Sequence, residues 1–460
     1  MNQSSCERYY ADDPGDALEA VGADALDPDA VAVIQRLRKA GHRAYLVGGC
    51  VRDHLLGHIP KDYDVATSAR PRQIKKVCRN SRIIGRRFRL VHVHFRGSNI
   101  IEVSTFRQDP REGSSESGSE DASDDAPDDT PDEDLLITHD NVFGTEEEDA
   151  QRRDFTINGL FLDDEGVIYD YVGGVEDLRQ RVLRTIGEPV RRIREDPVRI
   201  LRAIKFVTRH DLTLEPGLAA AMAEYHADLK RSAAPRVSEE LLRMMGGPSP
   251  DRAFELLAHY GILDVLLPEL EIHPHTDPSA DRRLELLSRR LGVLGSIDRG
   301  RRSLSTAVYL CLLLYDVAWD RFDTELERGN PNPNNALDDL IRPFAARCRL
   351  SRRDTARMRS IFQALRRIDP AWSSGLRKRR RRTPVRDLIS REYFRDTLMV
   401  FRVVSEAEER DADLVAQWEE RARLAREENP ESGSSESQEA RPRKRRRRRR
   451  RREPARSEDS

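Results

Sequence analysis

The chain has 460 residues, of which 38% are hydrophobic and 35% charged, so it is more polar than a typical globular domain. Its length allows roughly two to four domains. The net charge of −1 hides two opposed segments. Residues 109–134 hold twelve acidic residues and one basic residue, whereas residues 440–452 hold eleven basic residues and no acidic ones. The polar excess therefore comes partly from these segments, and the remainder is compatible with an ordinary folded protein.

Composition argues against several classes of protein. The longest apolar run, Ala307 to Tyr315, has nine residues, whereas a membrane helix needs about 20, so we expect no membrane span. The first residues contain neither a basic start nor an apolar stretch, which argues against a secretory signal. The five cysteines form no CxxC pair. We therefore expect neither a disulfide framework nor a zinc site, and we predict a cytoplasmic location.

Short helices and strands are expected in the first part of the chain. Residues 1–27 are acidic and poor in large apolar residues, which predicts a loose leader. Apolar residues at three-residue steps then predict a helix from residue 28 that ends at Gly41. Strands are expected at 43–49, 62–67, 89–95 and 99–106, and two more helices at 50–57 and 72–79.

An acidic insert interrupts this region. Residues 109–134 are rich in Ser, Asp, Glu and Pro and are expected to be disordered. A helix-like stretch at 149–161 and a strand at 167–173 follow, and beyond residue 176 helical patterns dominate. We predict an α+β fold with a small mixed-sheet head followed by an all-α neck, body and tail. The expected divisions are a disordered leader (1–27), a head (28–175), a helical neck (176–270), a helical body and tail domain (271–428) and a disordered Arg-rich tail (429–460).

Two glycines and two carboxylates form the first candidate site. Gly48 and Gly49 follow a predicted strand, and glycines let backbone N–H groups approach a triphosphate closely. Asp62 and Asp64 are two residues apart, so on a strand both point to one face. Carboxylates that close repel unless a cation lies between them, and their hard oxygen atoms suit Mg²⁺. We predict that Asp62 and Asp64 bind two Mg²⁺ ions, or Mn²⁺, for an in-line phosphoryl displacement.

Two further features lie in the same region. Arg52 follows the glycine pair and is a candidate contact of the same phosphates. His92 and His94 share one face of a predicted strand, but no third ligand is spaced to complete a metal site. For these histidines we expect structural roles or roles facing RNA.

The order of the motifs resembles a known family. The segment at 46–65, LVGGCVRDHLLGHIPKDYDV, is similar to the signature of the polymerase-β-like nucleotidyltransferases, in the branch of bacterial tRNA CCA-adding enzymes and poly(A) polymerases. Later blocks match in the same order: GRRFRLVHVHF, IIEVSTFR, EEDAQRRDFTINGLFLD, DYVGGVEDLRQRVLRTIG and REDPVRILRAIKF. The resemblance covers about residues 30–270, apart from the acidic insert. It implies a nucleotidyltransferase head and a nucleotide-selecting neck helix.

The motif at 152–154, Arg-Arg-Asp, gains its roles from this resemblance. Arg153 matches a nucleotide contact, and Asp154 matches an active-site residue. From the residues alone, a surface Arg–Asp pair that caps a helix is about as good an interpretation. A polymerase-type site often carries a third carboxylate, and we favour Asp154 for it. Glu102 is the alternative, because it points away from the buried face of its strand and either lines the cleft or faces water.

The segment at 195–202, EDPVRILR, is the candidate base reader. Asp196, Arg199 and Arg202 follow at three-residue steps, which predicts that they share one helix face. A surface salt bridge is the default explanation for this spacing. The resemblance implies instead that Asp196 and Arg199 read the amine and the ring nitrogen of ATP or CTP without a template. Arg202 is then a candidate contact of the phosphates or the ribose.

Poly(A) and CCA addition share all of these motifs. The blocks at 84–93 and 140–151 resemble the poly(A) polymerase subgroup. The ten consecutive bases at 443–452 can bind phosphates without reading sequence; a role in solubility or as a counter-charge is the alternative. We predict transfer of AMP from ATP to RNA 3′ ends, with ATP and RNA as partners and the Arg-rich tail on RNA. A CCA-adding enzyme and a catalytically silent RNA-binding protein remain the alternatives.

Overall fold

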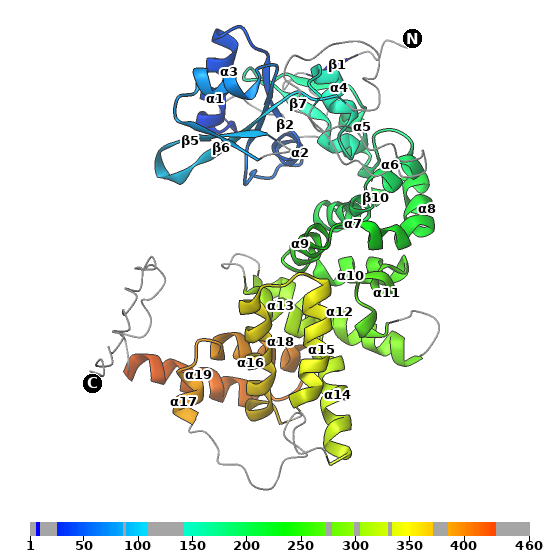
Figure 1. Ribbon diagram of the computed structural model, residues 1–460, viewed down its shortest axis with the longest axis vertical. Helices are drawn as coiled ribbons and strands as arrows, with labels where there is room; N and C mark the ends of the chain where they lie inside the picture. Colours follow the sequence, from blue (N-terminus) through cyan, green and yellow to red (C-terminus); the bar gives the residue numbers. More distant parts are fainter. Residues whose placement is uncertain are drawn as a thin grey trace, which may run out of the picture.

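A computed structural model describes residues 6–9, 25–85, 89–108, 142–272, 278–298, 304–329, 334–370 and 385–428. The predicted acidic insert (109–134), the Arg-rich tail (429–460) and most of the leader (1–27) lie outside the described residues. A mixed sheet with its helices lies at one end of the long axis, and a stack of helices lies at the other (Figure 1). The predicted α+β fold is therefore confirmed.

An eight-stranded sheet forms the head. Its strands, in spatial order, are β1 (Glu7–Tyr9), β8 (Ile168–Asp170), β7 (Leu160–Leu162), β2 (Ala44–Val47), β3 (Asp64–Thr67), β6 (Ile100–Thr105), β5 (Leu90–His94) and β4 (Ser81–Ile84). Neighbouring strands are antiparallel, except for the parallel pair β3 and β6. β1 lies within the segment that we expected to be a loose leader, and it pairs with β8.

The two faces of the sheet differ. Helices α1 (Pro28–Lys39) and α3 (Pro71–Val77) pack on one face, onto which the fully buried Val65 and Val103 project. α2 (Gly49–Leu55) follows β2 directly. Because side chains alternate along a strand, the residues next to these valines point the other way. The face without α1 and α3 therefore carries the candidate carboxylates.

The prediction of a helix over residues 149–161 is wrong. α4 (Glu146–Gln151) is followed by a loop, a 3-10 turn at Thr156–Asn158 and then strand β7. The apolar spacing of this segment fits a helix locally, but β7 pairs with both β2 and β8 in the sheet. Tertiary pairing therefore overrides the local pattern. As a result, the motif at 152–154 lies on a loop rather than at the start of a helix.

The remainder of the described chain is helical, apart from the two-residue strands β9 (Val182–Leu183) and β10 (Thr213–Leu214). The next helices are α5 (Gly174–Arg179), α6 (Pro189–Glu195), α7 (Val198–His210), α8 (Pro216–Tyr225), α9 (Ala234–Met245), α10 (Pro250–His259) and α11 (Ile262–Leu266). The last group is α12 (Pro278–Asp298), α13 (Thr306–Leu313), α14 (Tyr315–Glu327), α15 (Asn334–Arg347), α16 (Arg352–Ile368), α17 (Val385–Ile389), α18 (Phe394–Ala407) and α19 (Ala412–Glu428). We call this last group the body.

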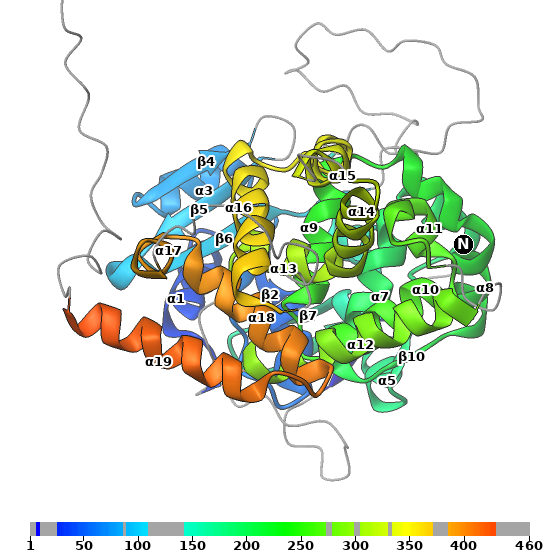
Figure 2. The ribbon, with the colours of Figure 1, turned by 90° about the horizontal axis from the view of Figure 1, so that it is seen from below.

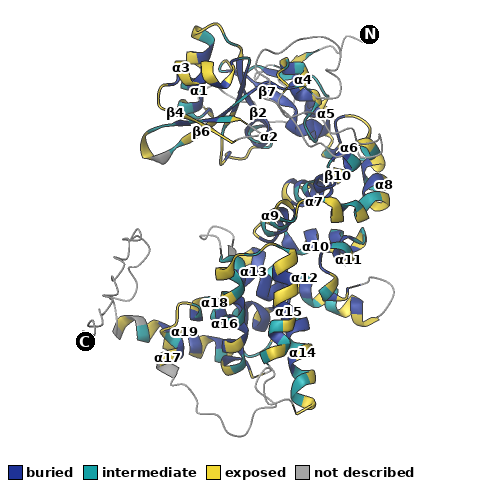
Figure 3. Cartoon of the chain, viewed as in Figure 1, coloured by how far each residue is buried: buried dark blue, intermediate teal, exposed yellow. Residues whose placement is uncertain are grey.

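The body has a buried interior that is continuous with that of the preceding helices. Buried residues gather where its helices face one another (Figure 3). α18 packs against both α16 and α19 (Figure 2). Across the described residues, none of the helices combines the length and the apolar character that crossing a membrane requires.

Candidate active site

A tight glycine turn joins the end of β2 to the start of α2. Gly48 has a φ of +72°, a backbone conformation that residues with a side chain rarely adopt. A Cβ atom at Gly48 would lie 3.1 Å from Nη1 of Arg153, and one at Gly49 would lie 3.6 Å from Nη2 of Arg52. Two guanidinium groups therefore border this turn, which places positive charge beside its backbone.

Three carboxylates lie near one another at the open end of β3. Asp64 is paired in register with Glu102 of β6, and Asp62 precedes it by two residues. Asp64 keeps exposed surface, but burial of its carboxyl group raises its pKa to about 6. Repulsion from Glu102 and Asp62 contributes to this rise in the pKa, whereas Arg153 opposes it. The site therefore carries negative charge that the protein does not fully neutralise.

This donor set fits a hard cation. Within the described ranges, no group of three or more His, Cys, Asp or Glu side chains could hold a metal ion as it stands. Mg²⁺, however, commonly takes one or two protein carboxylates together with substrate phosphates. Asp62 and Asp64 supply such a pair, and the raised pKa of Asp64 indicates charge that a cation would compensate. The residues therefore fit Mg²⁺ with its remaining ligands supplied by substrate.

Asp154 forms an ion pair with an arginine and is not part of the group of three carboxylates at β3. Its Oδ2 accepts from Nε and Nη2 of Arg202 at 2.7 and 2.6 Å, and its Oδ1 accepts from Nδ2 of Asn158 at 3.0 Å. Burial alone would raise the pKa of Asp154, but Arg202 and Asn158 hold it well below its usual range. In this structure, the expected third carboxylate and the expected phosphate contact therefore bind each other and join the head to α7.

Asn158 connects several of the predicted residues. The buried guanidinium of Arg52 donates to Oδ1 of Asn158 at 2.7 Å and to Oδ1 of Asp53 at 2.6 and 2.9 Å. Nη1 of Arg153 donates to the backbone oxygen of Asn158 at 3.2 Å. Asn158 was not among the predicted site residues, and its only signal in the sequence is its place four residues after Asp154 in the same motif. It holds Arg52, Arg153 and Asp154 in fixed relative positions.

Asp196 and Arg199 do not share one helix face, contrary to the prediction. Asp196 follows the last residue of α6, whereas Arg199 lies in the first turn of the separate helix α7. Both carboxylate oxygens of Asp196 accept from Arg236 of α9, at 3.1 and 2.7 Å. Arg199 is buried, and its Nη1 donates to the backbone oxygen of Arg192 at 2.6 Å. Arg236 lies 40 residues from Asp196, so no local sequence pattern indicates this pair.

Glu102, the alternative third carboxylate, has a partner on the next strand. His92 of β5 is its register neighbour, and Nε2 of His92 lies 3.1 Å from Oε1 of Glu102. The parallel pairing of β3 and β6 thus brings His92, Glu102 and Asp64 into one row across three strands.

Comparisons with known proteins match three parts of the chain. Residues 44–184 match the "Poly A polymerase head domain", residues 211–272 the "Probable RNA and SrmB- binding site of polymerase A", and residues 327–453 the "Polymerase A arginine-rich C-terminus". The chain belongs to the tRNA nucleotidyltransferase/poly(A) polymerase family. This confirms the resemblance that the order of the motifs indicated.

Similar family members match about half of the chain. The chain is 41% identical to poly(A) polymerase I of Salmonella typhi over 252 residues, which are 55% of this chain and 52% of that protein. It is 35% identical to the CCA-adding enzyme of Geobacillus stearothermophilus over 243 residues, 53% of this chain and 55% of that protein. The chain therefore spans about half the length of the curated relatives that it matches.

Solved structures of the family share the fold over most of the chain. The CCA-adding enzyme of Bacillus stearothermophilus in complex with CTP has a TM-score of 0.62 at 25% identity, and the match covers 88% of this chain and 84% of that one. A tRNA nucleotidyltransferase complexed with a primer tRNA and an incoming ATP analog has a TM-score of 0.56 at 21% identity, over 86% and 99% of the two chains. The nucleotidyltransferase fold thus extends into the helical region.

Proposed function

We propose that this chain is a template-independent poly(A) polymerase, which transfers AMP from ATP to RNA 3′ ends. The carboxylates Asp62, Asp64 and Glu102, next to a glycine turn bordered by Arg52 and Arg153, are the observation that carries this proposal. The preference for adenylate addition is supported by the higher identity to poly(A) polymerase I, 41% against 35% for a CCA-adding enzyme over similar lengths.

The reaction joins the RNA 3′-oxygen to the α-phosphorus of ATP and releases pyrophosphate. Asp62 and Asp64 would hold two Mg²⁺ ions, or Mn²⁺ in their place. The bound metal would supply charge stabilisation at the reacting oxygens. Gly49, the first residue of α2, would present its backbone N–H to the triphosphate, whereas the N–H of Gly48 donates to the backbone oxygen of Leu160 at 3.3 Å. The geometry supports Glu102 as the third carboxylate, in the place for which we first favoured Asp154.

The residues around the turn orient the nucleotide. Arg153 and Arg52 place positive charge beside the phosphates, and Asn158 fixes both of their side chains. Asp154 and Arg202 act through position, because their ion pair fastens the loop of Arg153 to the neck helix α7.

Base selection gives a test of the neck residues. We propose that Asp196 accepts from the adenine amine and that Arg199 donates to the ring nitrogen. One good base contact is worth about 1–3 kcal/mol of discrimination, so Asp196→Ala should lower the kcat/KM ratio of ATP over GTP, whose base has an oxygen in place of this amine, about 10- to 100-fold. The measurement is single-nucleotide incorporation onto an unstructured RNA. Glu239→Ala, an exposed carboxylate of α9, is the control, and an unchanged ratio in the Asp196 variant would contradict this role.

The raised pKa of Asp64 gives a pH dependence with a definite sign. This carboxyl must ionise before it binds a cation, so Mg²⁺ affinity should fall as the pH drops through about 6. The fold disfavours the ionised form, so the stability of the metal-free protein should decline as the pH rises from about 4 to about 6. Calorimetric Mg²⁺ titration and thermal melts measure the two effects. Asp64→Asn should abolish both, and constant Mg²⁺ affinity across this range would refute the assignment.

The choice between two activities needs one assay. Each nucleotide is supplied separately with Mg²⁺ to an unstructured oligomer and to a tRNA that lacks its terminal CCA. Long extension of both RNAs with ATP alone supports the proposal. Addition of two C and one A to the tRNA alone identifies a CCA-adding enzyme, the candidate favoured by the structural likeness to such an enzyme. RNA binding without any incorporation identifies a silent RNA-binding protein.

Two further expectations concern the RNA contact of the C-terminus and the location of the protein. The Arg-rich C-terminus is expected to bind RNA, on the ground of its charge alone. A cytoplasmic location is supported by the five cysteines, all of which are free thiols.

A further inference from the structure

A cavity of about 420 Å³ opens in the body, and Figure 1 places the body at the opposite end of the molecule from β3. Its walls come from α12, from α14 and from the turn between α18 and α19. Four arginines and two aromatic residues line it: Arg282, Arg289, Arg290, Arg410, Tyr315 and Trp319. The volume lies within the range of about 300–1,000 Å³ that is usual for small-ligand sites.

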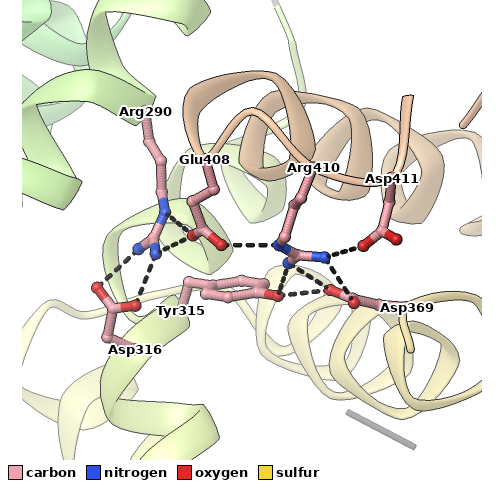
Figure 4. Close-up of polar contacts among 7 residues, drawn as sticks. All are labelled: Arg290, Tyr315, Asp316, Asp369, Glu408, Arg410 and Asp411. Atoms are coloured by element: carbon pink, nitrogen blue, oxygen red, sulfur yellow. Dashed lines mark hydrogen bonds and ion pairs between the residues drawn. The ribbon is translucent and has the colours of Figure 1, made fainter. Parts of the chain in front are cut away.

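A network of hydrogen bonds holds part of the wall in place (Figure 4). Arg290, whose side chain is 2% exposed, donates to both carboxylate oxygens of Asp316 at 2.7 Å and to Glu408 at 2.5 Å. Arg410 donates to Glu408 at 2.8 Å and to the hydroxyl of Tyr315 at 3.2 Å. The guanidinium of Arg290 lies 4.8 Å from the centre of the Tyr315 ring. These side chains are therefore positioned before any ligand arrives.

Two other arginines of the lining are available to a ligand. Arg282 is exposed, and in the described ranges it makes no hydrogen bond or ion pair. Arg289, two helical turns further along α12, is also exposed and pairs with the exposed Glu285. Such surface pairs are worth about 0–1 kcal/mol and exchange readily. Trp319 lies one turn after Tyr315 on α14 and is only partly buried. The cavity thus combines aromatic surface with arginines that can take an anion.

We propose that this cavity binds one nucleotide unit of single-stranded RNA, with the base beside Trp319 and the phosphate on Arg282 and Arg289. Bases stack on aromatic side chains and on guanidinium planes, and arginine binds phosphate in a bidentate manner. The lining contains four arginines and two carboxylates, a formal net charge of +2 that complements a phosphate. The inference rests on the proposed function, since it makes the body a second contact for an RNA whose 3′ end lies at β3.

A free mononucleotide presents the same base and phosphate as one unit of RNA. The test therefore distinguishes binding of RNA from binding of a free mononucleotide. Arg282→Glu and Trp319→Ala are compared with the parent chain for binding of oligo(A) of about 20 nucleotides, oligo(A) of about 4 nucleotides, and AMP. Loss of one base–aromatic contact costs about 1–3 kcal/mol, so the Kd of the long oligomer should rise about 10-fold. ATP incorporation onto the short primer should be unchanged, because the sheet of the head and the body lie at opposite ends of the molecule (Figure 1).

Arg342→Glu is the matched control. Arg342 is an exposed arginine of α15 without a hydrogen bond or ion pair in the part of the chain that the structure describes, and its substitution changes the charge equally. Trp319→Phe keeps an aromatic ring and should restore binding, and thermal melts monitor folding of every variant.

Three results would overturn the inference: parental Kd values in both cavity variants, an equal loss in the Arg282 and Arg342 variants, or AMP binding as tight as the long oligomer and lost in Trp319→Ala. The last result would reassign the cavity to a free mononucleotide. Failure of the parent chain to extend the short primer would instead contradict the proposed function and leave the cavity result standing.

Discussion

Asp64→Asn should lower kcat/KM for ATP by about 10³-fold or more, while RNA binding is retained. A bound cation supplies several kcal/mol of charge stabilisation in phosphoryl transfer, and each 1.36 kcal/mol is about a tenfold change in rate. Asn keeps the size of the side chain but removes the charge that burial, Glu102 and Asp62 already disfavour. The variant should therefore fold at least as well as the parent chain, and incorporation of labelled AMP measures the loss.

The matched control is Glu165→Gln. Glu165 lies between β7 and β8 in the same domain, is exposed, and has no side-chain hydrogen bond or ion pair among the described residues. Its substitution removes one negative charge without touching the carboxylate group, so activity should stay within about twofold of the parent. The double variant Asp62→Ala/Asp64→Ala should be as inactive as Asp64→Asn. AMP incorporation that survives in both would contradict the assignment of the site.

Arg290→Ala should destabilise the body by about 3–5 kcal/mol, the usual cost of removing one partner of a buried ion pair. Arg290 is buried between Asp316 and Glu408 (Figure 4). Without the guanidinium of Arg290, the carboxylates of Asp316 and Glu408 remain close together in a partly buried environment. The cost should persist at high salt, because buried pairs are screened much less than surface pairs.

Urea unfolding followed by tryptophan fluorescence measures this cost. Arg289→Ala is the control, because Arg289 directly precedes Arg290 on α12 but its pair with Glu285 is exposed. The control should change the free energy of unfolding by no more than about 0.5 kcal/mol. Equal effects of the two substitutions would contradict the structural role of the Arg290 network.

Local sequence pattern predicted most of the head. The strand before Gly48, the short helix after it and the strand that starts near Asp64 all lie where alternation and turn residues placed them. The helix over 149–161 failed because its apolar residues satisfy a helical period, while β7 gains its stability from pairing with β2. Strand β1 was missed because three residues in an acidic segment carry no periodic signal.

The candidate site was predicted less completely than the fold. Sequence spacing found Asp62 and Asp64, which are near each other in the chain. It could not show that Glu102 lies opposite Asp64 or that Asp154 pairs with Arg202, because both contacts depend on the tertiary fold. The same limit applies to the Asp196–Arg236 pair, which joins two helices through tertiary packing alone.

The strand order also constrains when the head can fold during synthesis. The central strand β2 has its neighbour β7 more than a hundred residues later in the chain, and β1 pairs with the still later strand β8. A nascent chain emerges at about 5–20 residues per second. The first helices and strands therefore leave the ribosome well before their partners, with β2 exposed along one edge. Such non-local pairing is slow to form and prone to aggregation, so a chaperone that shields this edge should raise the yield of folded protein.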